Sequence, residues 1–163
     1  MTQTQMAPTD LLRVRIQNNI GSNIVVTDVS EIPLYTSDVY GMGIPPALIV
    51  RPAELQQVSS IVKIATSMGF AITQRGGGMS YTGGYLPIHT HTVMLDLSAL
   101  NRIVSINEDD LVITVEAGVT WQQIWEALTP RGLRLPFFGT FSGSRATVGG
   151  GLSNGALFMG TAR

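Results

Sequence analysis

The chain has 163 residues, of which 44% are hydrophobic and 13% charged, and this composition fits one globular unit or two small subdomains. Its net charge of -1 and its scattered basic residues argue against nucleic acid as a partner. Because it has no cysteine, it can form no disulfide, zinc-thiolate site, iron-sulfur cluster or thiol nucleophile of its own.

No targeting or membrane segment is predicted. The first residues, MTQTQMAPTD, lack the basic start and apolar run of a secretory signal. No later stretch approaches the ~18 uninterrupted apolar residues of a membrane span. We therefore expect a soluble, cytoplasmic protein.

The first half of the chain predicts a strand, a helix and a second strand after a leading helix over residues 8–18. Residues 47–50, ALIV, follow two prolines as a buried strand. A helix over 53–69 ends at a glycine, and residues 70–74 form the second strand. Such a βαβ unit normally has parallel strands. One face of its helix is expected to carry Leu55, Val58, Ile61, Val62 and Ala65.

The second half of the chain predicts an antiparallel part. Short β-rich runs cover 92–97, 103–107 and 111–115, and they are separated by turn residues. A helix over 120–128 follows, with Thr120 as its N-cap.

These elements predict an α+β fold. Residues 1–43 form an N-terminal helix and lead-in, and residues 44–163 form the main domain. A small parallel βαβ part covers about 44–90, and a mainly antiparallel part with flanking helices covers about 91–163.

Glycine is the unusual component, at 18 residues, and it gathers in residues 76–84 and 139–160. The first cluster, within RGGGMSYTGG, follows the second predicted strand, where ligands of open α/β sheets bind. Bare backbone amides there suit an anion such as a diphosphate. The cluster lacks the Lys-Ser/Thr of a P-loop and the long helix of a Rossmann motif, and a tight turn without a ligand is the alternative.

The second cluster, within TFSGSRATVGGGLSNGALFMG, mixes glycine with Ser, Thr and Asn. These residues offer neutral hydrogen bonds rather than countercharge. They suit a large, mostly apolar cofactor with one diphosphate better than a triphosphate, which recruits Lys, Arg or a metal.

Three motifs in order resemble the FAD-binding domain of the vanillyl-alcohol oxidase and p-cresol methylhydroxylase flavoprotein superfamily. They are RGGGMSYTGG with the βαβ unit before it, VEAGVTW, and ATVGGGLSNGALFMG. The resemblance covers the chain from about Ile44 to its last residue. Within this superfamily, the chain most resembles the FAD-linked oxidases and dehydrogenases of the glycolate and D-lactate type. It implies that the α+β fold is an FAD-binding domain of two α/β subdomains.

The resemblance also implies three cofactor-binding stretches. The first glycine loop wraps the FAD diphosphate, a glycine at a strand end lets the backbone pass near the cofactor, and the second cluster runs along the ribityl chain and flavin ring. The matching residues are Gly76, Gly77, Gly78, Met79, Ser80, Thr82, Gly83, Gly118, Gly139, Thr140, Ser142, Gly143, Ser144, Ala146, Thr147, Gly149, Gly150 and Asn154.

Two departures from the family pattern are informative. Members that tether FAD covalently through this loop often carry histidine, in a pattern like R-S-G-G-H-S, where this chain has Met79. Methionine cannot form that bond, so we expect FAD to be bound non-covalently. No metal site is expected. Members are also much longer, with a second domain that supplies most substrate-binding and acid/base groups. We therefore expect the substrate domain, with the catalytic residues, on a complementary chain or C-terminal fragment.

Other residues have simpler explanations than a functional one. His89 and His91 are expected to be exposed loop residues, because no third ligand supports a metal site. Trp121 and Trp125 are one helical turn apart, which favours a core or interface role over flavin stacking.

The pair at 109–110 is expected to form a hairpin turn rather than paired acid/base carboxylates. Arg75 is expected to be structural, with the diphosphate or an acidic group as alternative partners. Nothing in the sequence selects among the tyrosines that could reach a substrate pocket, which are Tyr35, Tyr40 and Tyr81.

The first functional hypothesis is the FAD-binding portion of an oxidoreductase that oxidises a 2-hydroxy acid or alcohol by hydride transfer to FAD. The alternative is a non-catalytic FAD-binding assembly subunit that needs a partner chain for the substrate domain. A mean hydropathy of +0.24 at 13% charged residues favours the exposed apolar interface that this alternative needs. A third hypothesis is a related reductase that uses NADPH on an enolpyruvyl sugar. It has weaker support, because the distinctive substrate region that usually follows the domain in such reductases is absent from this sequence.

Overall fold

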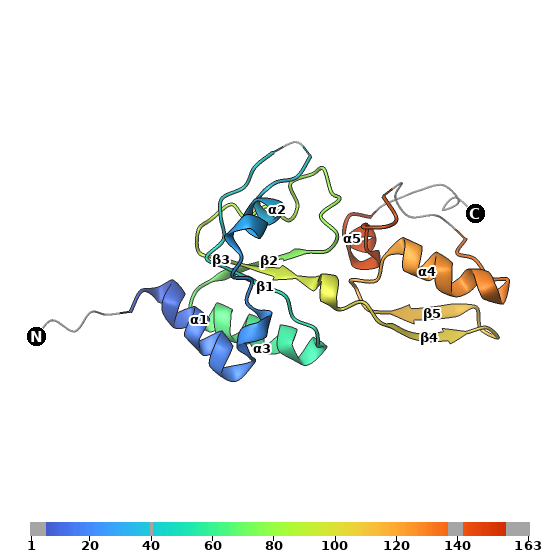
Figure 1. Ribbon diagram of the computed structural model, residues 1–163, viewed down its shortest axis with the longest axis horizontal. Helices are drawn as coiled ribbons and strands as arrows, with labels where there is room; N and C mark the ends of the chain where they lie inside the picture. Colours follow the sequence, from blue (N-terminus) through green and yellow to red (C-terminus); the bar gives the residue numbers. More distant parts are fainter. Residues whose placement is uncertain (1–5, 40, 137–141, 156–163) are drawn as a thin grey trace, which may run out of the picture.

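The computed structural model describes residues 6–39, 41–136 and 142–155, which fold into two lobes (Figure 1). Within these residues, the first lobe contains a three-stranded sheet and the second lobe a two-stranded sheet. The first sheet is parallel and the second antiparallel. This arrangement confirms the predicted α+β fold class.

The parallel sheet consists of β1 (Leu48–Val50), β2 (Ala71–Arg75) and β3 (Thr92–Asp96), in the order β1-β3-β2. The expectation that residues 92–97 belong to the antiparallel part is wrong, because β3 pairs in parallel with both neighbours. All of β3 is buried. A central strand that is covered on both faces has a nearly continuous apolar sequence, and such a run does not reveal the direction of its partners.

Helices cover both faces of this sheet (Figure 1). The helices α1 (Pro8–Asn19) and α3 (Leu55–Ser67) lie on one face, and the short α2 (Ile32–Thr36) lies on the other. Alternate strand residues point to opposite faces, so each face has its own core. The α1 and α3 side includes Leu12, Ile16, Leu48, Val50, Ile61, Ala65, Val93 and Leu95, and the α2 side includes Tyr35, Ile49 and Met94.

The local sequence explains the ends of α3. Glu54 caps its N-terminus in a capping box with Gln57, and Gly69 adopts a positive φ of 79° just past its C-terminus. The predicted apolar face is confirmed at Ile61 and Ala65, but Leu55 is 75% exposed. Leu55 is the first residue of the helix and lies ahead of the turns that contact the sheet.

The second lobe is a hairpin covered by a helix. The strands β4 (Ile103–Asn107) and β5 (Val112–Val115) pair in antiparallel fashion, as predicted, and α4 (Trp121–Leu128) packs on them. Their shared core includes Ile106, Ile113, Val119, Ile124 and Leu128.

Capping again fixes the helix boundary. Thr120 accepts a hydrogen bond from the backbone N–H of Gln123 at 3.2 Å, which confirms it as the N-cap of α4. The helix α5 (Val148–Ser153) is short and glycine-rich, and the sequence did not predict it. Short 3-10 helices over Ser22–Ile24, Val29–Glu31, Leu97–Ala99 and Thr129–Arg131 lie in the connections.

We predict that Ile61→Ala lowers the free energy of unfolding by about 2–5 kcal/mol, because Ile61 is fully buried between α3 and the sheet. Leu55→Ala on the same helix is the matched control, since that side chain is 75% exposed, and it should change stability by less than about 0.5 kcal/mol. Urea unfolding followed by circular dichroism measures both values. Equal losses in the two variants would contradict the described packing of α3.

Candidate functional site

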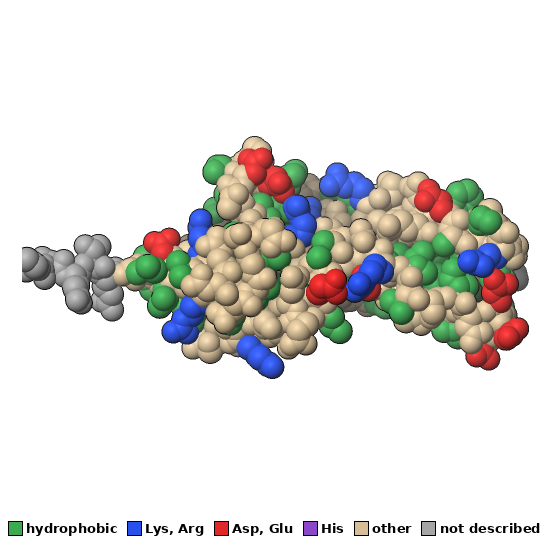
Figure 2. Space-filling model, turned by 60° about the horizontal axis from the view of Figure 1, so that its bottom comes forward, with side chains coloured by type: hydrophobic (Ala, Val, Ile, Leu, Met, Phe, Trp, Pro, Cys, Tyr) green, Lys and Arg blue, Asp and Glu red, His purple; other side chains and the backbone are tan. Residues whose placement is uncertain are grey.

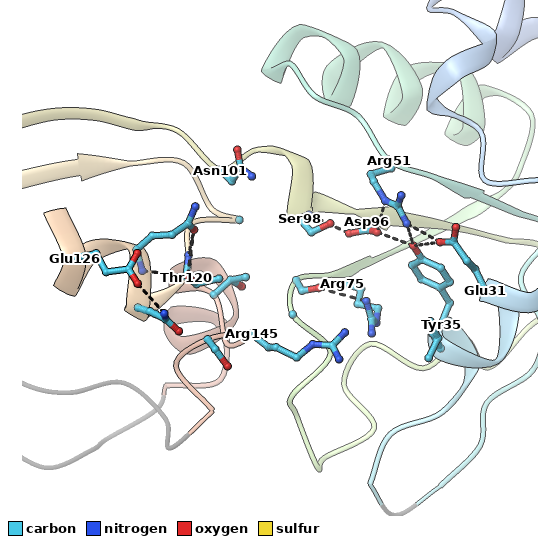
Figure 3. A pocket seen from close by; sticks show the side chains of 18 residues that line it. Glu31, Tyr35, Arg51, Arg75, Asp96, Ser98, Asn101, Thr120, Glu126 and Arg145 are labelled. Atoms are coloured by element: carbon cyan, nitrogen blue, oxygen red, sulfur yellow. Dashed lines mark hydrogen bonds and ion pairs between the residues drawn. The ribbon is translucent and has the colours of Figure 1, made fainter. Parts of the chain in front are cut away.

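A cavity of about 520 Å³ lies where the two lobes meet (Figure 3). Its walls come from the ends of β2 and β3, from α2, and from α4 with the segment before α5. This volume is within the range of small-molecule sites, and most of the residues that line it have polar side chains. Residues that line it include Tyr35, Arg51, Arg75, Asp96, Gln122 and Arg145.

The two glycine clusters meet at this cavity. A Cβ atom on Gly77 would overlap the backbone carbonyl of Arg145, and one on Gly76 would overlap the hydroxyl of Thr147. Glycine is therefore required at these positions by the close approach of another part of the chain. The expected reason, an approaching ligand, is not needed to explain the missing side chains.

Backbone hydrogen bonds hold the second cluster against the start of α4. The amide of Val148 donates to the carbonyl of Val119 at 2.8 Å, and the amide of Gly149 donates to the carbonyl of Ala117 at 2.9 Å. Gly118 is packed just as tightly, because a Cβ there would lie 2.7 Å from the carbonyl oxygen of Leu100. These contacts fix the wall that the second lobe contributes.

A charged network closes the other wall. Asp96, at the end of β3, is only 2% exposed and accepts hydrogen bonds from the Arg51 Nε at 2.8 Å and the Tyr35 hydroxyl at 2.7 Å. Arg51 also forms an ion pair with Glu31 at 2.8 Å and donates to the Tyr35 hydroxyl. The network attaches α2 and the turn before it to the sheet (Figure 3).

The network also sets the charge states of its members. Burial by itself would raise the pKa of Asp96, but hydrogen bonds from Ser98, Arg51 and Tyr35 outweigh burial and lower it. Burial, together with the hydrogen bond to Asp96, raises the pKa of Tyr35 to about 12. The hydrogen bond to Asp96 raises the pKa of Arg51. At neutral pH, Asp96 is therefore ionised and Tyr35 is a neutral phenol.

Arg75, at the end of β2, is half-buried and lines the cavity. Its guanidinium carbon lies 5.0 Å from the ring centre of Tyr35 and 5.5 Å from that of Tyr85, which places the cation between two aromatic rings. Its Nε is buried and has no hydrogen-bond partner among the described residues. The predicted structural role agrees with this packing, but the side chain also lines the cavity.

The structure brings part of the predicted cofactor-binding set together. Five of these residues line the cavity: Gly76, Gly77, Gly118, Ser144 and Thr147. Others support its walls or turns without lining it, and these are Gly78, Met79, Ser80, Thr82, Gly83, Ser142, Gly143, Ala146, Gly149, Gly150 and Asn154. Gly139 and Thr140 lie outside the described residues.

Several residues of the predicted set have clear local roles. Thr147 caps α5 by accepting from the amide of Gly150 at 3.3 Å, and the Asn154 side chain donates to the Gly150 carbonyl at 2.9 Å. The Ser80 and Thr82 hydroxyls are 2.9 Å apart, within a hydrogen-bonded turn.

Sequence reasoning missed most of the polar side chains in the cavity. Arg51 follows β1 and Asp96 ends β3, so both lie at the carboxyl ends of parallel strands, where ligand sites form. Recognition of residues 92–97 as a parallel strand would have found Asp96. No comparable signal marked Gln122, Glu126 or Arg145.

Of the tyrosines that the sequence left undecided, Tyr35 lines the cavity, and Tyr81 is 58% exposed and does not line it. Tyr40 lies outside the described residues. Trp121 packs on the core of the second lobe as expected, whereas Trp125 is 53% exposed.

The remaining residues agree with their simpler explanations. His89 and His91 are exposed, as expected, and His91 stacks on Phe70. Residues 107–110 form the predicted turn, in which the amide of Asp110 donates to the Asn107 side chain at 3.0 Å. No cluster of three metal-ligating side chains occurs within the described ranges. None of the helices in the described part of the chain is both long enough and apolar enough to cross a membrane.

Comparison with known proteins identifies the class of domain. The sequence profile of the family described as FAD binding domain matches residues 46–163. The chain therefore belongs to this family of FAD-binding domains.

Solved structures share the fold. Substrate-bound p-cresol methylhydroxylase superposes with a TM-score of 0.78 over 92% of this chain and 30% of its own, at 20% identity. The 4-ethylphenol oxidase of Gulosibacter chungangensis superposes with a TM-score of 0.73 over 93% of this chain and 30% of its own, at 25% identity.

Curated relatives extend the comparison to hydroxy-acid enzymes. The mitochondrial D-lactate dehydrogenase [cytochrome] of Kluyveromyces lactis is 32% identical over 67% of this chain and 19% of its own length. Glycolate oxidase subunit GlcD of Escherichia coli is 28% identical over 69% of this chain and 22% of its own length. The chain thus spans about a fifth of the length of these relatives.

The cavity fits the nucleotide half of the family's cofactor. Gly76, Gly77 and Gly118 present backbone without side chains at its edge, and Ser144 and Thr147 add hydroxyl groups. Bare amides and hydroxyls are suitable partners for phosphate oxygens. The side-chain amides of α4 and Asn101 supply hydrogen-bonding groups of the kind that bind a ribose or a base.

We predict that Gly77→Ala destabilises the fold by about 1–3 kcal/mol, because its Cβ would overlap the Arg145 carbonyl and force the backbone to move. Gly84→Ala in the same loop is the control, since the nearest atom to its Cβ is the Thr82 hydroxyl at 3.4 Å. Thermal unfolding compares the two variants. A Gly77→Ala variant as stable as Gly84→Ala would show that the two clusters do not touch.

We predict that Asp96→Asn weakens the dependence of the free energy of unfolding on pH in the acidic range. Because the pKa of Asp96 is lower in the folded chain, ionisation stabilises the fold above the ordinary aspartate pKa of about 4, and this stabilisation is lost as the pH falls through the folded value. At pH 7 the variant should lose about 1–3 kcal/mol. The exposed turn variant Asp109→Asn is the control.

Urea unfolding at pH 7, 5 and 3 measures these profiles. The stability difference between the unsubstituted chain and Asp96→Asn should shrink toward pH 3, whereas Asp109→Asn should follow the unsubstituted chain throughout. A difference that stays constant with pH would show that Asp96 is not stabilised as an anion.

Proposed function

We propose that the chain is the FAD-binding portion of a flavin-dependent oxidoreductase that oxidises a hydroxyl-bearing substrate, either a 2-hydroxy acid or an alcohol. The family match over residues 46–163 is the observation that carries this proposal. The names of the relatives, D-lactate dehydrogenase and glycolate oxidase, support a 2-hydroxy acid as the substrate class. Bound FAD supplies hydride acceptance, and the protein supplies binding and orientation.

In this proposal, the residues at the cavity edge hold the nucleotide part of FAD. Gly76, Gly77 and Gly118 contribute close backbone approach, and Ser144 and Thr147 contribute hydroxyl groups. The loop from Gly78 to Gly83 closes over the diphosphate, and the segment from Gly139 to Asn154 follows the ribityl chain and flavin.

FAD is held non-covalently in this proposal, because Met79 occupies the position of the tethering histidine and offers no ring nitrogen. The groups that contact the substrate lie outside these 163 residues, on a complementary chain or a further segment. The much greater length of the relatives supports this division. The cytoplasmic location stays a prediction.

A non-catalytic FAD-binding assembly subunit is the second candidate, and exposed apolar residues favour it. Figure 2 shows a group of apolar side chains on the second lobe, between charged ones. The exposed apolar residues of this lobe are Val104, Leu111, Val112, Trp125 and Leu152. Apolar side chains that gather on an exposed face, as in Figure 2, are typical of a surface that a partner covers.

We predict that the purified chain binds one equivalent of FAD and releases all of it on acid precipitation. The absorption spectrum of the supernatant measures the released flavin, and intact mass measures any that stays attached. Flavin that remains with the polypeptide would contradict the non-covalent arrangement. A folded chain that takes up no FAD would overturn the proposed function itself.

Reduction of the bound flavin by D-lactate separates the two candidates. An oxidoreductase completed by its substrate domain should bleach the flavin absorbance when a 2-hydroxy acid is added under argon. An assembly subunit with its partner bound should leave the flavin oxidised under the same conditions, with glycolate and an alcohol as well as with D-lactate.

A further inference from the structure

The two lobes share no apolar core. Among the described residues, the apolar clusters of the first lobe extend no further along the chain than Leu97, and the cluster of the second lobe begins at Ile103. Two units that are not joined by a large apolar interface are expected to move relative to each other. The orientation of the lobes therefore depends on the polar and backbone contacts that join them.

One of these contacts is an ion pair that lies outside the cavity. The Nη2 atom of Arg102, just before β4 of the second lobe, lies 3.1 Å from a carboxylate oxygen of Glu54, which caps α3 of the first lobe. Neither residue lines the cavity. Helix α3 covers the face of the parallel sheet opposite α2, and α2 contributes to the cavity wall (Figure 1). The ion pair thus joins the lobes at a second place, apart from the glycine contact beside the cavity.

A second carboxylate holds the Arg102 side chain in position. Within the second lobe, Glu116 accepts hydrogen bonds from the Nε of Arg102 at 3.0 Å, from its Nη2 at 2.7 Å and from its backbone amide at 2.8 Å. These hydrogen bonds lower the pKa of Glu116, so it is ionised at neutral pH. A guanidinium that is already oriented loses less side-chain entropy when it pairs with Glu54. Figure 2 shows acidic and basic side chains next to each other where the two lobes meet.

The strength of such a contact fits a role in orientation rather than in folding. The Arg102 side chain is 59% exposed and that of Glu54 is 57% exposed. An exposed ion pair changes an equilibrium only about two- to fivefold. This effect is small beside the stability of a folded chain, but it is enough to favour one of several lobe orientations that no apolar core fixes.

We propose that Arg102 is an electrostatic clamp between the lobes, which limits their rotation around residues 97–101 and keeps the cavity at its present width. Tyr35 and Asp96 line the cavity from the first lobe, and Gln122 and Arg145 line it from the second. Rotation of the lobes would therefore change the distance between the walls. Walls that are held in place need not be ordered when a ligand binds. Arg102 is a positioning residue, and its role does not depend on which ligand the cavity takes.

A distance measured across the cavity tests the clamp. Because the sequence has no cysteine, spin labels on two introduced cysteines report a single distance. Val29→Cys, just before α2, and Trp125→Cys, on α4, replace exposed side chains that do not line the cavity. Double electron–electron resonance measures the distribution of distances between the labels. The labelled chain with Arg102 intact should give one narrow main peak.

Two variants of the labelled chain remove the clamp from either side. Arg102→Gln should raise the population outside the main peak about two- to fivefold. Glu54→Gln should do the same, because it removes the charge that faces Arg102 and keeps a side-chain oxygen that can cap α3. Arg131→Gln is the matched control, since its exposed ion pair with Glu108 lies within the second lobe, and it should leave the distribution unchanged.

Sodium chloride distinguishes the clamp from the other ion pairs. At about 1 M salt, where the Debye length is about 3 Å, the labelled chain with Arg102 intact should gain the extra population that Arg102→Gln shows without salt. Salt should add little in Arg102→Gln, because the clamp is already absent. An equal salt effect in both chains would assign the change to the ion pairs of Arg51 beside α2 and overturn the clamp.

Two further outcomes would overturn the inference. If Arg102→Gln leaves the distribution as narrow as Arg131→Gln does, other contacts fix the lobes. If Arg102→Gln broadens the distribution and Glu54→Gln does not, the effect comes from Glu116 within the second lobe rather than from a link between lobes. Circular dichroism shows whether each variant is folded, and Glu54→Gln alone decides the question if Arg102→Gln is not.

Discussion

The contact between the two glycine clusters is the constraint on which the rest of the site depends. The loop after β2 comes so close to the segment before α5 that Gly77 lies against the Arg145 carbonyl and Gly76 against Thr147. A side chain at Gly77 would require the backbone to move, and one at Gly76 would require the Thr147 side chain to move. This contact brings the two lobes together at the carboxyl ends of the parallel strands, and the cavity forms beside it.

The charged network at the end of β3 gives the cavity its second fixed wall. Asp96 is buried and stays ionised because Arg51 and Tyr35 donate hydrogen bonds to it, so α2 is attached to the sheet rather than free to move away. The same tyrosine provides one of the rings that hold Arg75. One buried carboxylate therefore orients groups on two elements, and its partners satisfy the charge that burial would otherwise penalise.

The described walls of the site carry groups that are suited to binding a polar ligand. Its polar groups are guanidiniums, amides, hydroxyls and bare backbone, and the carboxylates on its walls are paired or hydrogen-bonded. These groups suit a cofactor with phosphates and a nucleoside. This agrees with membership of an FAD-binding domain family whose relatives are several times longer than this chain.

The sequence by itself determined the family, the helices with clear caps, and the location of both glycine clusters, because these features depend on local residue order. Thr120 and Gly69 are examples. The tertiary structure alone decided that residues 92–96 are a central parallel strand and that Arg145 reaches the cavity. Strand partners and side-chain convergence arise from contacts between distant parts of the chain, and no local pattern encodes them.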